Sequence, residues 1–204
     1  MVTRQALVRV TDDVPIRPRA PGTLRLVQEF VNTHDLETGS DELADADALR
    51  SWLRARGMLQ GGTAVRVADV ARAVALREAL RALLLANNGE RDDPRASEVL
   101  DRIAARARLA PRFVGPRSYR LEVGAAGVDG AVGRIVAAVA EAMDAGTWER
   151  LKACRNDACQ WAFYDASRNR SGAWCRMAVC GNRMKVRAFR RRQRAASARP
   201  PDRG

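Results

Sequence analysis

Amphipathic helices dominate the pattern of apolar positions along the first three quarters of the chain. Apolar residues recur at steps of three and four across residues 67–86, across a segment that starts at Pro94 and ends before Pro111, and across residues 129–145. This is the period of a helix with one buried face. Asp93 and Pro94 form a capped start for the second of these segments. The three segments together predict a mostly helical body with its own core.

Other segments of this body carry shorter signals. Residues 1–36 are predicted to form short extended stretches broken by prolines, and LRLVQEFV (24–31) within them fits a strand and a helical turn equally well. Residues 112–124 alternate around Gly-Pro and predict a β-hairpin, whereas residues 147–154 predict a short helical lead capped by Thr147. A helix is also predicted over residues 41–56. Its solvated face is expected to carry Asp41, Glu42, Asp45 and Asp47.

The only four cysteines lie close together as Cys154, Cys159, Cys175 and Cys180. They form two knuckles, each with four intervening residues, separated by fifteen residues. Pairs of thiolates at such short spacing can occupy two edges of the tetrahedron that zinc prefers. Four protein ligands would leave no position for substrate or water, so the spacing predicts one structural zinc ion and no catalytic metal.

Two alternatives to zinc remain at this stage, namely two disulfides or free redox-active thiols. The first eighteen residues contain no apolar run of signal-peptide length, so we expect a reducing cytoplasm, where disulfides rarely persist. A segment of about 40 residues also seldom folds without a metal or a cross-link. Both considerations favour zinc.

The residues after the second knuckle read Cys180, Gly181, Asn182, Arg183, and the stretch between the knuckles reads FYDASRNRSGAWC. In both features the segment resembles the CGNR-type zinc finger. The phrases LVQEFVNTHD (26–35) and LREALRALL (76–84) are similar to motifs of the ABATE domain, found in stress-induced transcription regulators. The resemblance implies a regulator built from an ABATE-like domain and a zinc finger.

The predicted fold class is therefore α+β and predominantly α. Residues 1–149 are expected to form an ABATE-like helical domain with a small β-hairpin. Residues 150–204 are expected to form a treble-clef or ribbon-like four-cysteine finger that ends in a basic helix. No glycine or proline linker separates the two parts, so the finger is expected to pack against the body.

Charge is spread very unevenly along the chain. The net charge is +12, from 36 basic and 24 acidic residues, but residues 1–149 hold 21 of each. All the excess lies in residues 150–204, which fits binding to a polyanion such as nucleic acid and predicts that the body alone has no such affinity. A coding bias toward arginine, a solubilising arm and attachment to an anionic membrane surface are the alternatives.

A basic helix is predicted from Asn182 to about Arg194, with Asn182 as its cap and Met184, Ala188 and Phe189 docking it on the finger. Arg183 fits two roles equally, neutralising the metal cluster or binding a phosphate. Aromatic rings of the finger are expected to pack beside the zinc, with Tyr164 the best candidate for an exposed ring. The candidate nucleic-acid contacts are Arg168, Arg170, Arg183, Lys185, Arg187, Arg190, Arg191 and Arg194.

No phosphate-binding glycine loop and no hydrolase motif is present, and His34, the only histidine, has no partner motif, so we expect no enzyme. The leading hypothesis is a cytoplasmic DNA-binding transcription regulator, associated with the nucleoid when bound. RNA is a second candidate partner, and the helical domain offers a surface for a homodimer. A zinc-braced protein-interaction module and a small-molecule sensor remain alternatives, and no membrane span is predicted.

Overall fold

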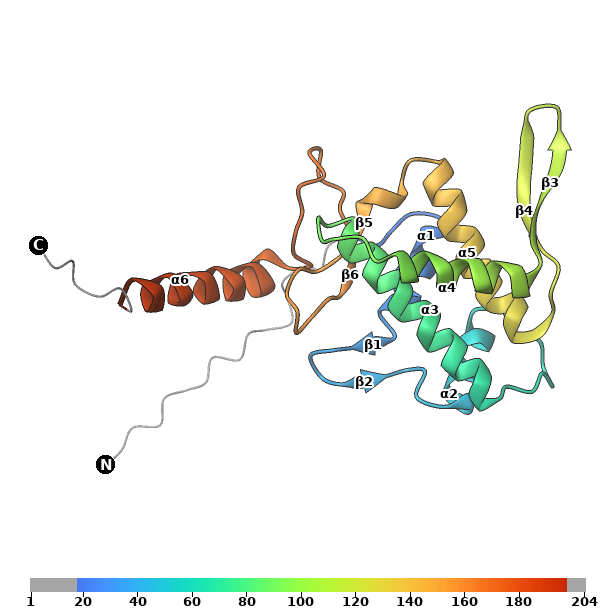
Figure 1. Ribbon diagram of the computed structural model, residues 1–204. Coiled ribbons are helices and arrows are strands. Elements are labelled where there is room, and N and C mark those ends of the chain that lie inside the picture. The colour runs from blue at the N-terminus through green and yellow to red at the C-terminus, as the bar shows by residue number, and fades with distance from the viewer. Residues whose placement is uncertain (1–17, 198–204) are drawn as a thin grey trace, which may run out of the picture.

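The computed structural model describes residues 18–197, which form a helical body followed by a small module that ends in a projecting helix (Figure 1). The elements in chain order are α1 (Leu24–Val31), β1 (His34–Asp35), β2 (Ser40–Asp41), α2 (Ala46–Ala55), α3 (Val67–Ala86), α4 (Pro94–Ala107), β3 (Leu109–Gly115), β4 (Ser118–Val123), α5 (Gly127–Asp144), the 3-10 turn η1 (Trp148–Arg150), β5 (Leu151–Ala153), β6 (Ala162–Tyr164), the π-helical turn η2 (Met177–Gly181) and α6 (Asn182–Ser197). The strands pair two by two, all antiparallel. The fold is α+β and predominantly α, as predicted.

The core of the body lies between α3 and its neighbours. Leu76, Leu80 and Leu84 of α3 are fully buried in the same cluster as the apolar face of α5. Helix α5 also packs closely on α4 at Gly133. A Cβ at this position would lie only 2.3 Å from the Cβ of Ala107, so glycine is needed there. The three long helices predicted from periodicity are therefore present, and they build the scaffold that carries the rest of the chain.

The ambiguous segment LRLVQEFV is a helix, α1. Its residues Leu24, Val27, Phe30 and Val31 are all buried, and only the helical period places these four on one side. This helix contacts α5, α3 and the C-terminal strand β6. The extended stretches predicted before residue 18 lie outside the described residues.

Helix α2 is shorter than predicted, beginning at Ala46 and not at Asp41. Asp45 caps it, since its carboxylate accepts hydrogen bonds from the backbone N–H groups of Asp47 at 2.9 Å and Ala48 at 2.8 Å. Asp41 lies in β2, and its two carboxylate oxygens bind the guanidinium of Arg77 at 2.6 and 2.9 Å. The prediction that Asp41 faces solvent on a helix was wrong because this carboxylate holds a buried arginine.

The lead into the first cysteine also differs from the predicted helix. Only a 3-10 turn, η1, forms, and strand β5 follows it. Thr147 does not cap a helix, since its hydroxyl donates to the carbonyl of Ala142 at 3.2 Å. A strand forms because Leu151 and Ala153 need burial on one side while Lys152 lies on the other, which is the two-residue period of a strand.

The hairpin of β5 and β6 joins the body to the C-terminal module. Leu151 pairs with Tyr164 and Ala153 with Ala162, and this face belongs to the core of the body. The opposite face carries Phe163, which packs against the four cysteines. As expected, the module packs directly on the body, and the two share this hairpin.

Among residues 18–197, no helix combines the length and the apolar character needed to cross a membrane.

Candidate metal centre and nucleic-acid interface

The four cysteines predicted as metal ligands converge in the fold. All four are buried and unbridged, and their sulfur atoms lie within 4.8 Å of one another. The Sγ atoms of Cys159 and Cys175 are 3.6 Å apart, and those of Cys175 and Cys180 are 3.7 Å apart. A zinc ion with four sulfurs at about 2.3 Å would separate neighbouring sulfurs by about 3.8 Å. The sulfur positions fit this tetrahedron and are much too far apart for disulfides.

A tight backbone turn shapes the first knuckle. The carbonyl of Asn156 accepts hydrogen bonds from the N–H of Cys159 at 2.7 Å and from that of Gln160 at 3.0 Å, and Gln160 takes the left-handed conformation at φ 45°. The buried side chain of Asn156 reaches across and donates from Nδ2 to the sulfur of Cys180 at 3.6 Å. Asn156 thus connects the two knuckles, a role that no motif in the sequence indicated.

The second knuckle runs through η2 into α6. A Cβ at Gly181 would lie 2.4 Å from the sulfur of Met177 and 3.1 Å from the ring of Trp174, so glycine permits the chain to pass close to both. Asn182 was predicted to cap α6, but it does not, because helical backbone continues from η2 through this residue. Its side chain donates instead to the carbonyl of Ala178 at 3.0 Å.

Thiols gathered this closely cannot all ionise without a cation. Hydrogen bonds from Cys159 and Cys175 lower the pKa of Cys154. Hydrogen bonding to Cys154 and burial raise the pKa of Cys159 and of Cys175. A bound dication would let all four cysteines ionise together, because its positive charge stabilises the thiolates, the form that binds metal. Four soft, buried thiolates fit zinc, and the filled cluster would carry a net charge of about −2.

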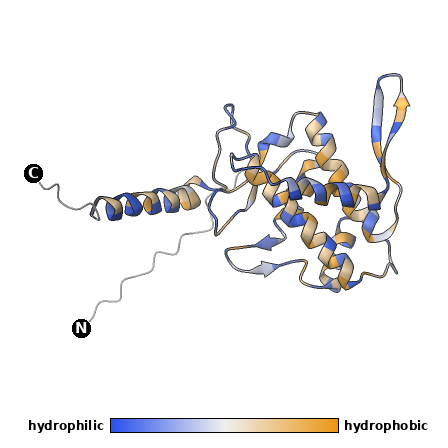
Figure 2. Cartoon of the chain, in the orientation of Figure 1, coloured by the Kyte–Doolittle hydropathy of each residue, from blue (hydrophilic) through white to orange (hydrophobic). Residues whose placement is uncertain are grey.

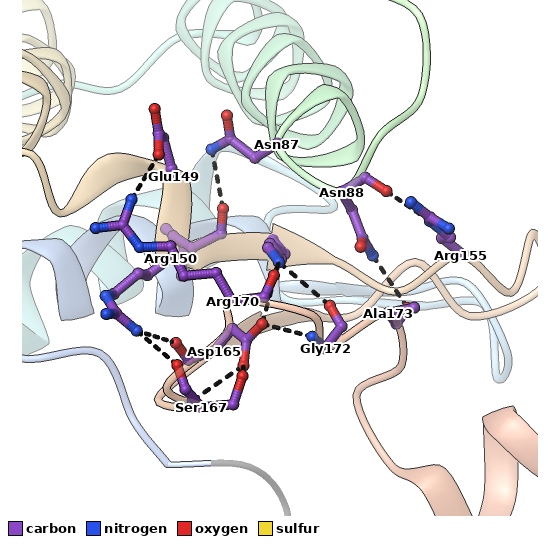
Figure 3. A network of polar contacts seen from close by, with 12 residues as sticks. Asn87, Asn88, Glu149, Arg150, Arg155, Asp165, Ser167, Arg170, Gly172 and Ala173 are labelled. Carbon is purple, nitrogen blue, oxygen red and sulfur yellow. Dashed lines mark hydrogen bonds and ion pairs between the residues drawn. The ribbon is translucent and has the colours of Figure 1, made fainter.

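Asp165 shapes the loop between the knuckles. Its carboxylate accepts hydrogen bonds from the Ser167 hydroxyl at 2.7 Å, the Gly172 N–H at 2.6 Å and the buried ammonium of Lys152 at 3.0 Å (Figure 3). Burial alone would raise the pKa of Asp165, but these donors together hold it well below its usual range. The aspartate and serine of the FYDASRNRSGAWC stretch therefore position the loop that leads to Cys175.

Asparagine side chains attach the module to the body. Asn87 donates to the carbonyls of Trp148 and Leu151, both at 3.0 Å. Asn88 donates to the carbonyl of Ala153 at 2.7 Å and to that of Ala173 at 3.0 Å, the second of which is drawn in Figure 3. The sequence indicated these asparagines only as the end of α3. Their side chains hold the backbone of the module on both sides of the first knuckle.

The first two arginines of α6 turn back toward the rest of the molecule. Arg183 forms an ion pair with Glu37 of the β1–β2 turn. Glu37 raises the pKa of Arg183, and the sulfurs of Cys180 and Cys159 act in the same direction. Arg187 donates to the side-chain oxygen of Asn156 at 3.4 Å. The ion pair with Glu37 and the nearby sulfurs fit the neutralising role predicted for Arg183, and its phosphate-binding role stays a prediction.

The remainder of α6 projects away from the body (Figure 1) and is coloured as largely hydrophilic (Figure 2). Its basic residues are all exposed, and the helix contains no acidic residue. Spacing of four, three and four residues places Arg183, Arg187, Arg190 and Arg194 along one side, which we call the arginine ridge. Arg191 borders this ridge, whereas Lys185 and Arg192 lie on other sides of the helix.

Two aromatic predictions in the module need correction. Phe189 does not dock α6, because its side chain is 54% exposed, and Met184 and Ala188 are only partly covered. Tyr164 is not an exposed ring, because it pairs with Leu151 on the side of the hairpin that packs on the core of the body. The expectation that the rings pack beside the cysteines is confirmed for Phe163, together with both tryptophans of the module.

The two arginines predicted in the loop lie apart from the ridge. Arg168 and Arg170 are exposed, and Arg170 forms an ion pair with Glu149 of η1 at 2.7 Å. Within residues 18–197, no hydrogen bond or ion pair joins this loop pair to α6. The structure thus gathers the metal ligands into one site but distributes the eight predicted nucleic-acid contacts between a loop and a helix.

Sequence comparison agrees with this two-part geometry. Residues 24–147, more than half of the chain, match the ABATE family, described as "Putative stress-induced transcription regulator". The chain belongs to the ABATE family. Residues 150–193 match the CGNR zinc finger, so the ABATE segment ends just before the four-cysteine module begins. No match to a curated protein accompanies these two family matches.

Both resemblances drawn from the sequence are therefore confirmed. The CGNR match covers the four cysteines and most of α6, including the whole arginine ridge except Arg194. The ABATE match covers the scaffold helices and the residues that hold the module, among them Asn87 and Asn88.

Proposed function

We propose that this ABATE-family protein is a stress-responsive transcription regulator that binds DNA through the arginine ridge of α6. One zinc ion, held by Cys154, Cys159, Cys175 and Cys180, would brace the module. The observation that carries the proposal is a projecting helix with one continuous arginine side and no acidic residue. Such a surface neutralises backbone phosphates, the largest source of affinity in nonspecific DNA binding.

Zinc has a structural role in this proposal. When bound, it supplies the positive charge that lets four crowded thiols ionise, and its four protein ligands leave no position for a substrate. The chain's own residues do the rest, since Asn156 connects the knuckles and Gly181 permits the close turn into α6. No catalytic activity is assigned to the chain, and the proposed site of action is the cytoplasm, at the nucleoid.

The test measures affinity for duplex DNA by fluorescence anisotropy over a range of salt concentrations. Replacing Arg190, Arg191 and Arg194 together by alanine removes exposed charges without touching Glu37 or Asn156, which Arg183 and Arg187 contact. Each phosphate contact contributes about −0.9 to the slope of log affinity against log salt, so the slope should flatten by about two to three.

A matched control replaces Arg54, Arg95 and Arg102, which are exposed on α2 and α4, by alanine. The change in net charge is the same, but the slope should stay close to that of the wild type. Equal slopes in the α6 variant, the control and the wild type would exclude the ridge as the DNA-binding surface. That result would favour the zinc-braced protein-interaction module. RNA binding and a homodimer through the helical domain remain predictions from the sequence.

A further inference from the structure

The β3–β4 hairpin is the second part of the molecule that projects from the body, on the side away from α6 (Figure 1). Only its base is anchored, where Leu121 and Val123 of β4 are partly covered next to α5. Every residue from Pro111 to Arg120 is exposed. We call this exposed part the hairpin arm. A two-stranded arm that packs on nothing contributes little to the core that the helices already form.

One face of the arm presents a cross-strand aromatic pair. Phe113 lies opposite Tyr119, and their side chains are 78% and 48% exposed. Val114 beside them is 55% exposed. Three of the large apolar side chains that are most exposed in residues 18–197 thus gather on one arm. Contiguous exposed apolar groups on a soluble protein commonly mark an interaction surface.

The other face of the arm is basic. Arg112 lies directly opposite Arg120, and both reach the single carboxylate of Glu122, at 3.4 and 3.8 Å. Like charges directly opposite in a strand pair destabilise it, and one carboxylate cannot neutralise two guanidinium groups. Arg117 in the turn adds a third positive charge. The arm therefore carries an excess of positive charge that an anionic partner would neutralise.

The neutral total of residues 1–149 conceals this arrangement. Residues 111–120, the arm itself, contain three arginines and no acidic residue, so the rest of residues 1–149 holds eighteen basic and twenty-one acidic residues. Positive charge is concentrated on the arm, and the helical body around it is net negative. The expectation that the body has no polyanion-binding surface came from its net charge of zero. Net charge does not reveal such a surface when the positive residues gather on one arm.

Nucleic acid matches both faces of the arm. Its phosphates would neutralise the arginines, and its bases or sugars would cover the aromatic rings, a combination found in surfaces that bind nucleic acid through stacking and charge. Pairing of the arms of two copies is disfavoured, because it would bring six arginines together. We propose that the hairpin arm is a second nucleic-acid contact, made by Phe113 and Tyr119 with Arg112, Arg117 and Arg120. The inference rests on the proposed function.

Two variants of the full, zinc-loaded chain test the arm separately from α6. Phe113→Ala with Tyr119→Ala should lower affinity for a single-stranded oligonucleotide about thirtyfold or more, because each ring that stacks on an unpaired base raises affinity at least about fivefold. Its salt slope should not change. Arg112→Ala, Arg117→Ala and Arg120→Ala together should flatten the slope by about two to three. Both variants should keep their zinc and their circular dichroism spectrum, because the substituted side chains are exposed.

The control with Arg54, Arg95 and Arg102 replaced by alanine sets the effect of net charge alone. If the wild type binds DNA and both arm variants match this control, the inference is overturned while the proposed function stands. If the wild type binds no nucleic acid, both fail. Light scattering measures the oligomeric state of the wild type and of the aromatic variant. A wild-type dimer that dissociates in the aromatic variant would identify a second copy of the chain as the partner of the arm and overturn the inference.

Discussion

The side chain of Asn32 binds both backbone groups of Ala162. Its Nδ2 donates to the carbonyl of Ala162 at 2.9 Å, and its Oδ1 accepts from the N–H of the same residue at 2.7 Å. Asn32 is the C-cap of α1, and Ala162 opens β6, so 130 residues of chain separate them. The side-chain amide of Asn32 thus pairs with the backbone of Ala162 at the edge of the β5–β6 hairpin, as the backbone of a neighbouring strand would.

Replacing Asn32 by alanine should destabilise the whole protein. The change would leave the N–H of Ala162 without a partner in a buried site, which costs about 1–3 kcal/mol. Urea unfolding of the zinc-loaded protein measures the loss as a lower midpoint. Alanine at Asn169, an exposed loop asparagine, is the matched control. A midpoint for Asn32→Ala equal to that of the control would show that the two bonds contribute no stability.

Purified protein should contain one zinc ion per chain, and serine at Cys175 should abolish its binding. The physical reason is that the module's core consists of the four cysteines and the rings around them, so it lacks an apolar core of its own. Elemental analysis of freshly reduced protein provides the measurement, with unfolding of the module on chelation followed by tryptophan fluorescence. Zinc at less than half an equivalent in such a preparation would contradict the proposal.

The ion pair between Asp41 and Arg77 should make stability depend on pH in a defined direction. Burial raises the pKa of Asp41, but the hydrogen bonds from Arg77 outweigh it and lower the pKa overall. A carboxyl whose folded pKa is lowered stabilises the protein above its unfolded pKa of about 4 and loses that contribution as the pH falls through the folded value.

Asp41→Asn tests this dependence. Near neutral pH the variant should lose about 1.5–3 kcal/mol, the range for hydrogen bonds to a charged group, because Arg77 is buried and keeps only Glu78 as an acidic partner. The difference from the wild type should be constant from pH 8 to about pH 5 and shrink below about pH 4. Comparing the two proteins at each pH cancels the acid lability of the metal site. A difference that persists unchanged at pH 3 would refute the assignment.

Hydrogen exchange should separate α6 from the scaffold. Arg183 and Arg187, Arg187 and Arg191, and Arg190 and Arg194 are like charges four residues apart, each pair of which weakens a helix by about 0.2–0.5 kcal/mol. The amides of α6 should therefore exchange much faster than those of α3, and duplex DNA should slow exchange in α6 and in the hairpin arm but not in α3. Unchanged exchange in α6 at saturating DNA would argue against its role as the contact helix.

The sequence predicted those elements whose signals are local. Helix α3 has the predicted bounds, and α4 begins at Pro94 because Asp93 caps it. The convergence of the cysteines followed from their spacing, which is also a local property. These features depend on periodicity and end signals within one segment, so they do not require knowledge of the fold.

Features set by distant partners could not be predicted in this way. Asp41 was assigned to a helix because its partner, Arg77, lies 36 residues further along the chain. The segment before Cys154 was predicted as helix because its strand partner, β6, follows only after the knuckle. Phe189 was expected to be buried because apolar residues usually are, yet nothing in residues 18–197 covers more than half of it. Such errors concern tertiary neighbours, which periodicity does not reveal.

The shared β5–β6 hairpin means that the boundary between the two family matches is not a boundary in folding. A chain cut at residue 149 would leave the body with a hole where Leu151, Ala153 and Ala162 belong, and would leave the finger with those apolar residues in water. Recombination could not move this finger to another protein without a receptor surface that includes counterparts of Asn32, Asn87 and Asn88. We therefore expect the two segments to fold as one unit and not as independent parts.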